Sequence, residues 1–338
     1  MKSVSIRGGG IAACCCTRLL RQAGFAVTTG HVDRSKLPAI MLSETTQKLL
    51  ADVFESDSLF AGLHRIRRRV VLWGEGGEPV VLPHSALVVS EQMILDRIHS
   101  SLEASAQERQ EPGEWSIFAA RSSREEPAPS VVEHQFGSRF AAASPVVLRS
   151  EEAADGCWIE SQQEGWLFLL PCDRRSGWLL SVGASNEAML AQSRLVAAQI
   201  TETGASAGRF PSHPRIAEPL AAPGWLACGT AALGFDPLCG EGAANAAREA
   251  ILGTAVIRAA SEGADVAALV AHYTARLASG FRRHLEVCRE FYATGCRGPW
   301  WDQQIADLDR GLVWSSQQLA QFPGFRYRLN GFSLEAVR

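Results

Sequence analysis

The sequence predicts an α/β fold in which a parallel domain built from βαβ units carries an inserted antiparallel sheet and a C-terminal helical segment. Three observations support this. A glycine-rich turn joins an apolar strand to a helix within residues 4–29. A second glycine cluster, residues 229–242, opens a helix of small residues. Between the clusters, apolar runs that begin with aromatic residues alternate with turn residues, which is typical of antiparallel strands.

The first unit reads as strand, glycine turn, helix and second strand. Residues 4–6 are apolar and partly β-branched, and residues 25–29 form a second strand after Gly24, which suits a helix C-cap. In a GxGxxA fingerprint, Gly8 allows the tight turn and Gly10 lets a pyrophosphate approach the N-terminus of the helix. Ala13 is the small residue where helix and strand pack closely. This arrangement predicts a dinucleotide-binding βαβ unit.

The acidic residue expected at the end of the second strand is missing. The register about twenty residues beyond the glycines falls on residues 30–33, which read Gly, His, Val and Asp. His31 therefore takes the place of the acid, unless the strand slips and Asp33 does so. In either case the sequence predicts that an adenosine is held in an unusual way.

The remaining elements follow from apolar periodicity and turn residues. Ser43 suits an N-cap for the helix that ends at residue 54, and the basic run 64–69 is interpreted as a solvated strand edge. The other expected elements are a hairpin (70–73, 79–82), a helix (90–105), strands (87–89, 115–120, 136–148, 157–159, 225–228), an aromatic hairpin (165–170, 177–182), and helices (186–204, 243–260, 266–292, 301–322). Residues 264–338 are expected to be mostly helical.

These elements predict a nucleotide-binding domain in three parts. The parts are residues 1–60, 91–121 and 186–262. A hairpin (61–90) and residues 122–185 form the inserted substrate domain, and residues 263–338 form the C-terminal helical region. Polar links at 108–113 and 122–130 separate the segments in the middle of the chain.

Composition excludes several classes of function. The net charge of −3 gives no reason to expect nucleic acid as a partner. No apolar run approaches the roughly 20 residues of a membrane span, and the N-terminus leaves no room for a secretory signal. The nine cysteines, three of them consecutive at 14–16, read as small core residues in a reducing cytoplasm. No CxxC occurs and the eight histidines are scattered, so no metal site is predicted.

The two glycine clusters, in this order and about 220 residues apart, resemble FAD-dependent monooxygenases of the aromatic-hydroxylase type. The chain is most similar to the branch with tryptophan halogenases, geranylgeranyl reductases and flavoproteins that mature quinone cofactors. The resemblance implies a Rossmann-like FAD-binding domain, in which the second cluster contacts the pyrophosphate, the ribityl chain and the flavin ring. The cofactor contacts that it implies are Gly8, Gly9, Gly10, Ala13, His31, Gln92, Gly229, Thr230, Asp236, Pro237, Gly240, Gly242 and Ala243.

Several of these positions depart from the family pattern. Thr230 stands for an aspartate, Gln92 for an arginine, and the DG-type motif expected after residues 115–120 is not there. The stretch GWLFLLP resembles the halogenase signature that lines the tunnel to the substrate, so Trp166, Phe168 and Pro171 are expected substrate contacts, with Phe168 in place of the second tryptophan. The three lysines, at positions 2, 36 and 48, lie outside the region where a halogenase lysine is expected, which disfavours halogenation.

The leading hypothesis is a cytoplasmic FAD-dependent monooxygenase that hydroxylates an aromatic ring, such as an indole or a tryptophan within a peptide. Electrons would come from NADH or NADPH, or from a partner flavin reductase. Alternatives are a flavin-dependent reductase of double bonds, and a non-catalytic binding partner with weakened cofactor binding. No side chain is assigned a catalytic role. Glu44, His84 and His134 could assist proton transfer, although such isolated residues are usually surface or core residues.

Overall fold

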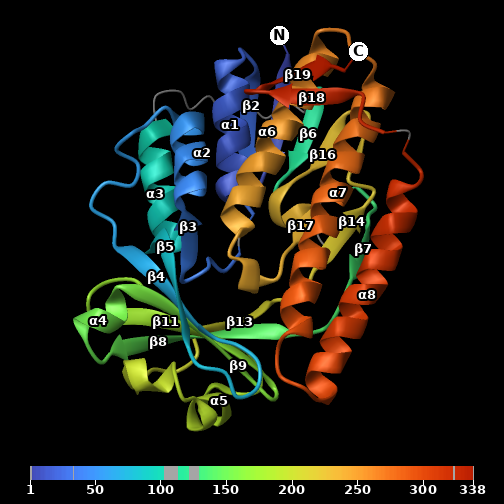
Figure 1. Cartoon of the computed structure of the whole chain (residues 1–338). Coiled ribbons are helices and arrows are strands. Elements are labelled where there is room, and N and C mark those ends of the chain that lie inside the picture. Colours follow the sequence, from blue (N-terminus) through green and yellow to red (C-terminus); the bar gives the residue numbers. More distant parts are fainter. Residues whose placement is uncertain (1, 33, 103–112, 122–128, 323, 338) are drawn as a thin grey trace.

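A computed structural model describes residues 2–32, 34–102, 113–121, 129–322 and 324–337. Two large sheets organise the chain, and they stand at opposite ends of the view in Figure 1, with the long helix α7 running from one to the other. The upper sheet carries the glycine turns, and the lower sheet is the inserted one. The fold is therefore the predicted α/β architecture with an inserted sheet and a C-terminal helical region.

The upper sheet has five strands in the order β15-β16-β6-β1-β2, parallel except for the β15–β16 pair. Helices α1 and α6 pack side by side against it (Figure 1). The predicted strand, glycine turn, helix and strand at the N-terminus are confirmed. The elements are β1 (Ser3–Arg7), α1 (Ile11–Gln22), β2 (Ala26–Gly30), β6 (Trp115–Phe118), β15 (Ala221–Ala222), β16 (Trp225–Ala227) and α6 (Gly242–Ser261).

The inserted sheet runs β12-β8-β11-β10-β9-β4-β5-β3, with β13 also paired to β8. Every pair is antiparallel except β4–β9, and the aromatic hairpin β10–β11 is confirmed. The basic run was expected at a sheet edge, but it lies in β4, between β5 and β9. The strands are β3 (Ile40–Ser43), β4 (Arg65–Leu72), β5 (Val80–Val89), β8 (Phe140–Leu148), β9 (Gly156–Gln162), β10 (Gly165–Pro171), β11 (Ser176–Gly183), β12 (Ile200–Thr203) and β13 (Gly208–Pro211).

Arginines are tolerated in this interior strand because their long stems carry the charge to partners on the neighbouring strands and on helices α2 and α4. Arg65 donates to Ser85 and Gln47, and the guanidinium of Arg68 lies 5.5 Å from the centre of the Trp158 ring and donates to the carbonyl oxygen of Glu152. A basic run therefore did not identify an edge strand here.

The predicted helix 186–204 is wrong beyond its first turns, because α5 ends at Gln192. The buried carboxylate of Glu160 accepts the hydroxyl of Ser193 at 2.5 Å and the backbone N–H of Arg194 and Val196 at 2.7 and 2.9 Å. These bonds replace the next helical turn. The shorter elements are α2 (Glu44–Phe54), α3 (Glu91–Leu102), α4 (Glu151–Ala154), α5 (Asn186–Gln192), η1 (Ala197–Gln199), η2 (Gly229–Ala231), η3 (Pro237–Cys239), β7 (Val132–Gln135), β14 (Arg215–Glu218) and β17 (Leu233–Gly234).

The C-terminal region contains two long antiparallel helices, α7 (Val266–Ala293) and α8 (Pro299–Leu319), as predicted. A final hairpin of β18 (Tyr327–Asn330) and β19 (Ser333–Ala336) was not predicted. Its four-residue strands are short and mostly polar, so they carry little apolar periodicity. None of the helices in the described ranges is both long and apolar enough to cross a membrane.

Candidate functional site

The two glycine turns meet at the end of strand β6. Gly8 has φ +137°, and a Cβ there would lie 3.1 Å from the backbone nitrogen of Ala120. Gly229 has φ +54°, and a Cβ there would lie 2.9 Å from the Cβ of Ala12 and 3.0 Å from the carbonyl oxygen of Ala119. Both positions therefore require glycine, for conformation and for space. Residues about 220 apart in the sequence thus form one composite turn.

Each turn opens a helix whose N-terminus has no side-chain cap. Gly10 is the N-cap of α1 and Glu241 that of α6, and neither makes a side-chain capping bond. The first turns of both helices also lack acidic residues. Since first-turn amides have no partner within their own helix, these two ends present donors and partial positive charge to an anion.

A histidine and an ion pair lie against the first turn. A Cβ on Gly9 would stand 3.2 Å from Nδ1 of His31, and one on Gly10 would stand 2.9 Å from Nη2 of Arg34. Arg34 pairs through both terminal nitrogens with the buried Glu91, with 2.9 Å between Nη1 and Oε2. Glu91 also accepts the N–H of Leu37 at 2.9 Å. The alternative acid, Asp33, lies outside the described residues.

The sequence interpretation missed Arg34 and Glu91. It looked for an acid at the end of β2 and for a contact at Gln92, one residue away from Glu91. Gln92 instead donates to Asp96 at 2.7 Å on an exposed face of α3. The helical register provides a usable signal, because residue 91 falls on the buried side of the first turn of α3.

The second turn is anchored by a buried polar network around Asp236. Oδ2 of Asp236 accepts Nη2 of Arg139 at 2.5 Å and the hydroxyl of Tyr292 at 2.8 Å, while Oδ1 accepts the N–H of Leu238 at 2.9 Å. Arg139 and Asp236 are 6% and 1% exposed, so water solvates neither charge and each depends on the other as its counterion. Nε1 of Trp166 donates to the Tyr292 hydroxyl at 3.1 Å, which connects the network to strand β10.

The predicted substrate contacts lie on or beside this network. Trp166 and Phe168 pack into the core shared with the glycine turns, while Leu167 and Leu169 pack on the other face of the sheet. The expected alternation of strand faces is confirmed. Pro171 ends β10 and is also buried. A role for the three residues in binding substrate stays a prediction.

The other predicted cofactor residues stand along the second turn. The carbonyl oxygen of Thr230 accepts Arg215, and Pro237 begins η3. Gly240 has φ +65°, and a Cβ there would meet Cε of Met41 at 2.8 Å. A Cβ on Gly242 would meet no atom within 4 Å, and Ala243 follows Gly242 in the first turn of α6.

The candidate proton-transfer residues are not brought together. Glu44 is in α2 beside Arg65, and His84 receives a hydrogen bond from Arg69 in the inserted sheet. Nε2 of His134 lies 2.6 Å from Oε2 of Glu218, in the three-stranded sheet β17-β14-β7.

A buried acid supports the second turn from α6. Oε2 of Glu249 accepts the N–H of Gly229 at 2.6 Å, and Oε1 has no hydrogen-bond partner. Burial raises the pKa of Glu249 to about 8, against the lowering effects of the Gly229 N–H and of Arg215. The neutral acid can place its proton on Oε1, so the second turn rests on a carboxyl group that titrates near physiological pH.

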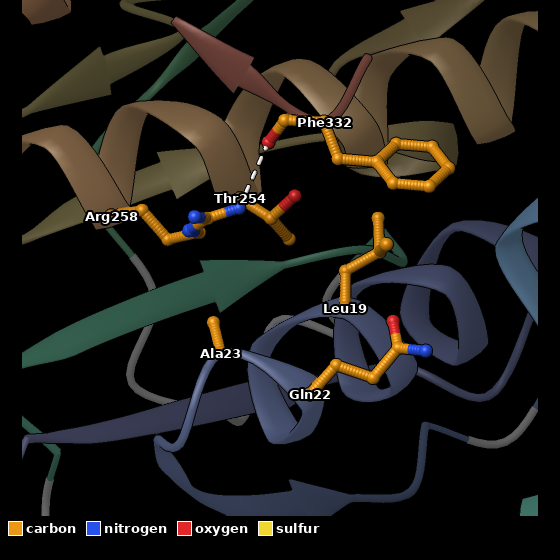
Figure 2. A pocket seen from close by; sticks show the side chains of 6 residues that line it. All are labelled: Leu19, Gln22, Ala23, Thr254, Arg258 and Phe332. Atoms are coloured by element: carbon orange, nitrogen blue, oxygen red, sulfur yellow. Dashed lines mark hydrogen bonds between the residues drawn. The ribbon is translucent and has the colours of Figure 1, made fainter.

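Two cavities lie away from the composite turn. The smaller, about 130 Å³, lies between α1, α6 and the C-terminal hairpin, where Arg258 donates to the carbonyl oxygen of Phe332 at 3.2 Å (Figure 2). The larger, about 480 Å³, lies on the inserted sheet among residues that include Phe140, Ser144, Ser181 and Arg209. The lining of this larger cavity does not include Trp166, Phe168 or Pro171.

Comparison with known proteins gives structural matches alone. No family model and no curated protein match the sequence. The flavin-dependent halogenase CmlS is 16% identical with a TM-score of 0.74, and the alignment covers 99% of this chain and 84% of that one. The peptidyl tryptophan dihydroxylase QhpG is 16% identical with a TM-score of 0.70, covering 99% and 86%.

HpxO of Klebsiella pneumoniae, solved with FAD and uric acid, is 16% identical with a TM-score of 0.61, covering 95% of this chain and 93% of that one. At such identities a likeness shows the fold. The chain has the fold of the flavin-dependent halogenases and monooxygenases over nearly its whole length.

Proposed function

We propose that this chain, which has the fold of flavin-dependent halogenases and monooxygenases, binds FAD and oxidises an aromatic ring with molecular oxygen. The observation that carries the proposal is the composite turn, in which Gly8 and Gly229 pack against Ala119 and Gly229 also meets Ala12 in the uncapped first turn of α1. An elongated anionic nucleotide is the class of ligand that such an arrangement suits.

The residues at the turn fit this cofactor. Gly9 and Gly10 carry no side chain, so His31 and Arg34 stand over this turn, and the amides of α1 would hold the pyrophosphate when Arg34 turns toward it. His31 would supply a polar contact at the adenosine end, in place of the usual acid, and Arg34 lies beside Gly10, where the pyrophosphate would bind. The amides that follow Gly240, at the start of α6, would face the flavin ring, where a helix N-terminus stabilises negative charge.

When bound, FAD would supply the electrons and the oxygen chemistry of the reaction. The chain's own part is to position the substrate and to exclude water. Trp166 and Phe168 are 0% and 2% exposed on the face of β10 that packs toward the glycine turns, where they would form the apolar wall of the site. The Tyr292–Asp236–Arg139 network joins that wall to the second turn, so the two are held in one geometry.

Hydroxylation of an aromatic ring, with an indole or a tryptophan-containing peptide as substrate, is favoured over halogenation. Among the three lysines, the ammonium of Lys2 donates to Ser261 at the end of α6, and Lys48 lies in α2. Lys36 precedes β3. A hypohalous acid guided by lysine therefore has no support near the β10 wall. NADH, NADPH or a partner flavin reductase would provide the electrons.

Binding of FAD is the first test. The purified chain should show flavin absorbance or, if isolated without it, should gain thermal stability when FAD is added, whereas riboflavin, which lacks the ADP half, should have a weaker effect. Oxygen consumption with NADH or NADPH should then rise with tryptophan-containing peptides, and mass spectrometry should find added oxygen. A colourless protein that FAD does not stabilise would overturn the proposal and favour a binding protein without catalytic function.

A further inference from the structure

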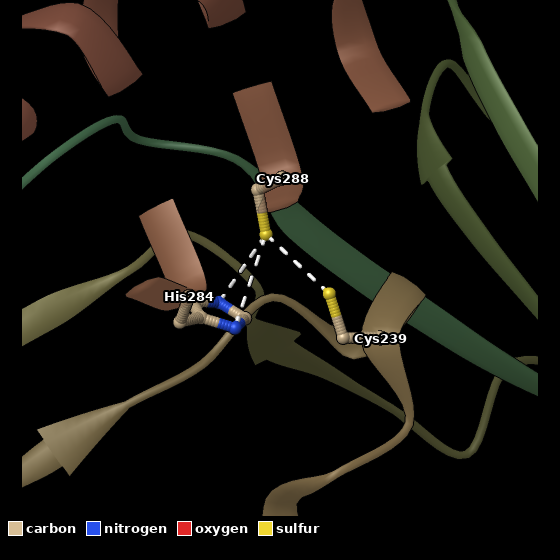
Figure 3. Close-up of side chains that lie close together, drawn as sticks. All are labelled: Cys239, His284 and Cys288. Atoms are coloured by element: carbon tan, nitrogen blue, oxygen red, sulfur yellow. Dashed lines mark hydrogen bonds between the residues drawn. The ribbon is translucent and has the colours of Figure 1, made fainter. Parts of the chain in front are cut away.

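A cluster of two cysteines and a histidine lies directly behind the second turn. Cys239 is the last residue of η3, and His284 and Cys288 are one turn apart on the same face of α7. The Sγ atoms of Cys239 and Cys288 are 3.7 Å apart, and Sγ of Cys288 lies 3.4 Å from Nε2 of His284 (Figure 3). His284 and Cys288 are buried, while Cys239 is partly exposed.

Two kinds of chemistry are compatible with these distances. Two sulfurs and a nitrogen around a tetrahedral zinc ion would be about 3.6 to 3.8 Å apart, close to the 3.7 Å and 3.4 Å observed here. Two thiols in contact, ready to form a disulfide, would have a similar separation. The distances alone therefore do not distinguish a metal site from a redox pair.

The hydrogen bonding of His284 distinguishes them. Nε2 of His284 accepts the backbone N–H of Asp236 at 2.9 Å, so its lone pair is in use and the ring proton is on Nδ1. A metal ion on either nitrogen would need this arrangement undone, leaving the buried N–H of Asp236 without its acceptor, at a cost of about 1–3 kcal/mol. Oxidation of the two thiols leaves the bond intact.

The cluster also favours thiolate chemistry. Contact with the Cys288 thiol, and then with His284, lowers the pKa of Cys239 to about 6, although burial opposes this. Contact with Cys239 and burial raise the pKa of Cys288, so Cys239 is the more acidic thiol of the pair. A thiolate is the form that attacks a disulfide, and Cys239 is the more accessible of the pair.

We propose that Cys239 and Cys288 form a redox-active dithiol that exchanges with low-molecular-weight disulfides of the glutathione class. The Cys239 thiolate attacks one sulfur of glutathione disulfide, whose S–S bond breaks and releases one glutathione. Cys288, losing its proton, attacks the Cys239 sulfur of the mixed disulfide and releases the second glutathione. The protein loses two electrons and two protons, and one glutathione disulfide becomes two thiols.

The movement required is small, and its consequence is local. The sulfurs must close from 3.7 Å to about 2.0 Å. The new bond would tie η3, which leads through Gly240 into α6, to helix α7. The second turn would then have two covalent states. This inference does not depend on whether FAD binds.

The test is a redox titration of the full chain. The purified protein is equilibrated in glutathione buffers of graded ratio, free thiols are alkylated, and intact mass and digested peptides are measured. We expect a single two-electron transition and a peptide pair joined through Cys239 and Cys288. Cys239→Ser and Cys288→Ser should abolish the link. Cys172→Ser is the matched control, because Cys172 is also partly exposed but its sulfur lies against the backbone oxygen of Leu170.

The order of attack gives a second measurement. Cys288→Ser should retain one glutathione on Cys239, whereas Cys239→Ser should retain none on the buried Cys288. If a variant fails to fold, the peptide map of the unaltered chain still decides. Absence of the link in excess glutathione disulfide would overturn the proposal. So would the finding that the purified chain holds one equivalent of zinc and releases it when the thiols are alkylated.

Discussion

The two glycine turns lie side by side but are held in different ways. The first is flanked by His31 and by an Arg34–Glu91 pair whose arginine is 25% exposed. The second is anchored by the Arg139–Asp236 pair, whose side chains are 3% and 0% exposed, and by a buried acid, Glu249. The first turn is therefore held partly by a side chain that reaches solvent, and a ligand that competes for Arg34 could change it. The second has a fixed shape, which suits the half of a site that must align reacting groups.

Asp236→Asn should have the largest effect, because it leaves the buried Arg139 without a countercharge. We expect a loss of about 3–5 kcal/mol in the free energy of unfolding, measured by urea denaturation. Asp309→Asn is the matched control, since Asp309 meets Arg289 at 2.5 Å but both side chains are more than 40% exposed. That variant should lose less than about 1 kcal/mol. Equal losses would show that the second turn is not anchored by this pair.

A pH dependence should follow from Glu249. Its pKa is about 8 in the folded chain, above the usual value of 4.5. Between pH 4.5 and pH 8 the folded chain therefore keeps a proton on Glu249 that the unfolded chain has released. Stability should therefore fall as pH rises from about 5 to 8, by roughly 4 kcal/mol for this group. Glu249→Gln keeps the bond from Gly229 and removes the charge, so the fall should be smaller by that amount. Parallel curves of stability against pH for the two proteins would contradict the assignment.

The same contrast explains what could be predicted from the sequence. The strand, glycine turn and helix at residues 4–29 follow from local conformation, because Gly8 is needed at φ +137° whatever surrounds it. The network around Asp236 depends on Arg139, Tyr292 and Trp166, which come from three distant segments; only Trp166 lies in a recognised motif, and that motif does not indicate the network. Helix α5 was predicted too long for the same reason, since a distant carboxylate, Glu160, ends it. Contacts between remote elements have no local signature.

Among the substitutions at Asp236, Glu249 and Glu91, Glu91→Gln should have the smallest effect on stability. It tests most directly whether the first turn changes when a ligand binds. Glu91 is buried and binds Arg34 and the N–H of Leu37, so the apo protein should lose about 1–3 kcal/mol. Under the proposed function, FAD should bind several-fold more tightly, because Arg34 is freed for the pyrophosphate and a negative charge beside Gly10 is removed. Isothermal titration with FAD measures both this gain and its salt dependence.

Gln92→Ala is the control for this prediction, because Gln92 was the expected cofactor contact and donates instead to Asp96 on the exposed face of α3. It should leave FAD affinity within about twofold, since a single exposed hydrogen bond contributes little to affinity. If Gln92→Ala weakened FAD binding while Glu91→Gln left it unchanged, the adjustable element at the first turn would be α3 itself, and Arg34 would serve only to hold Glu91 in the core.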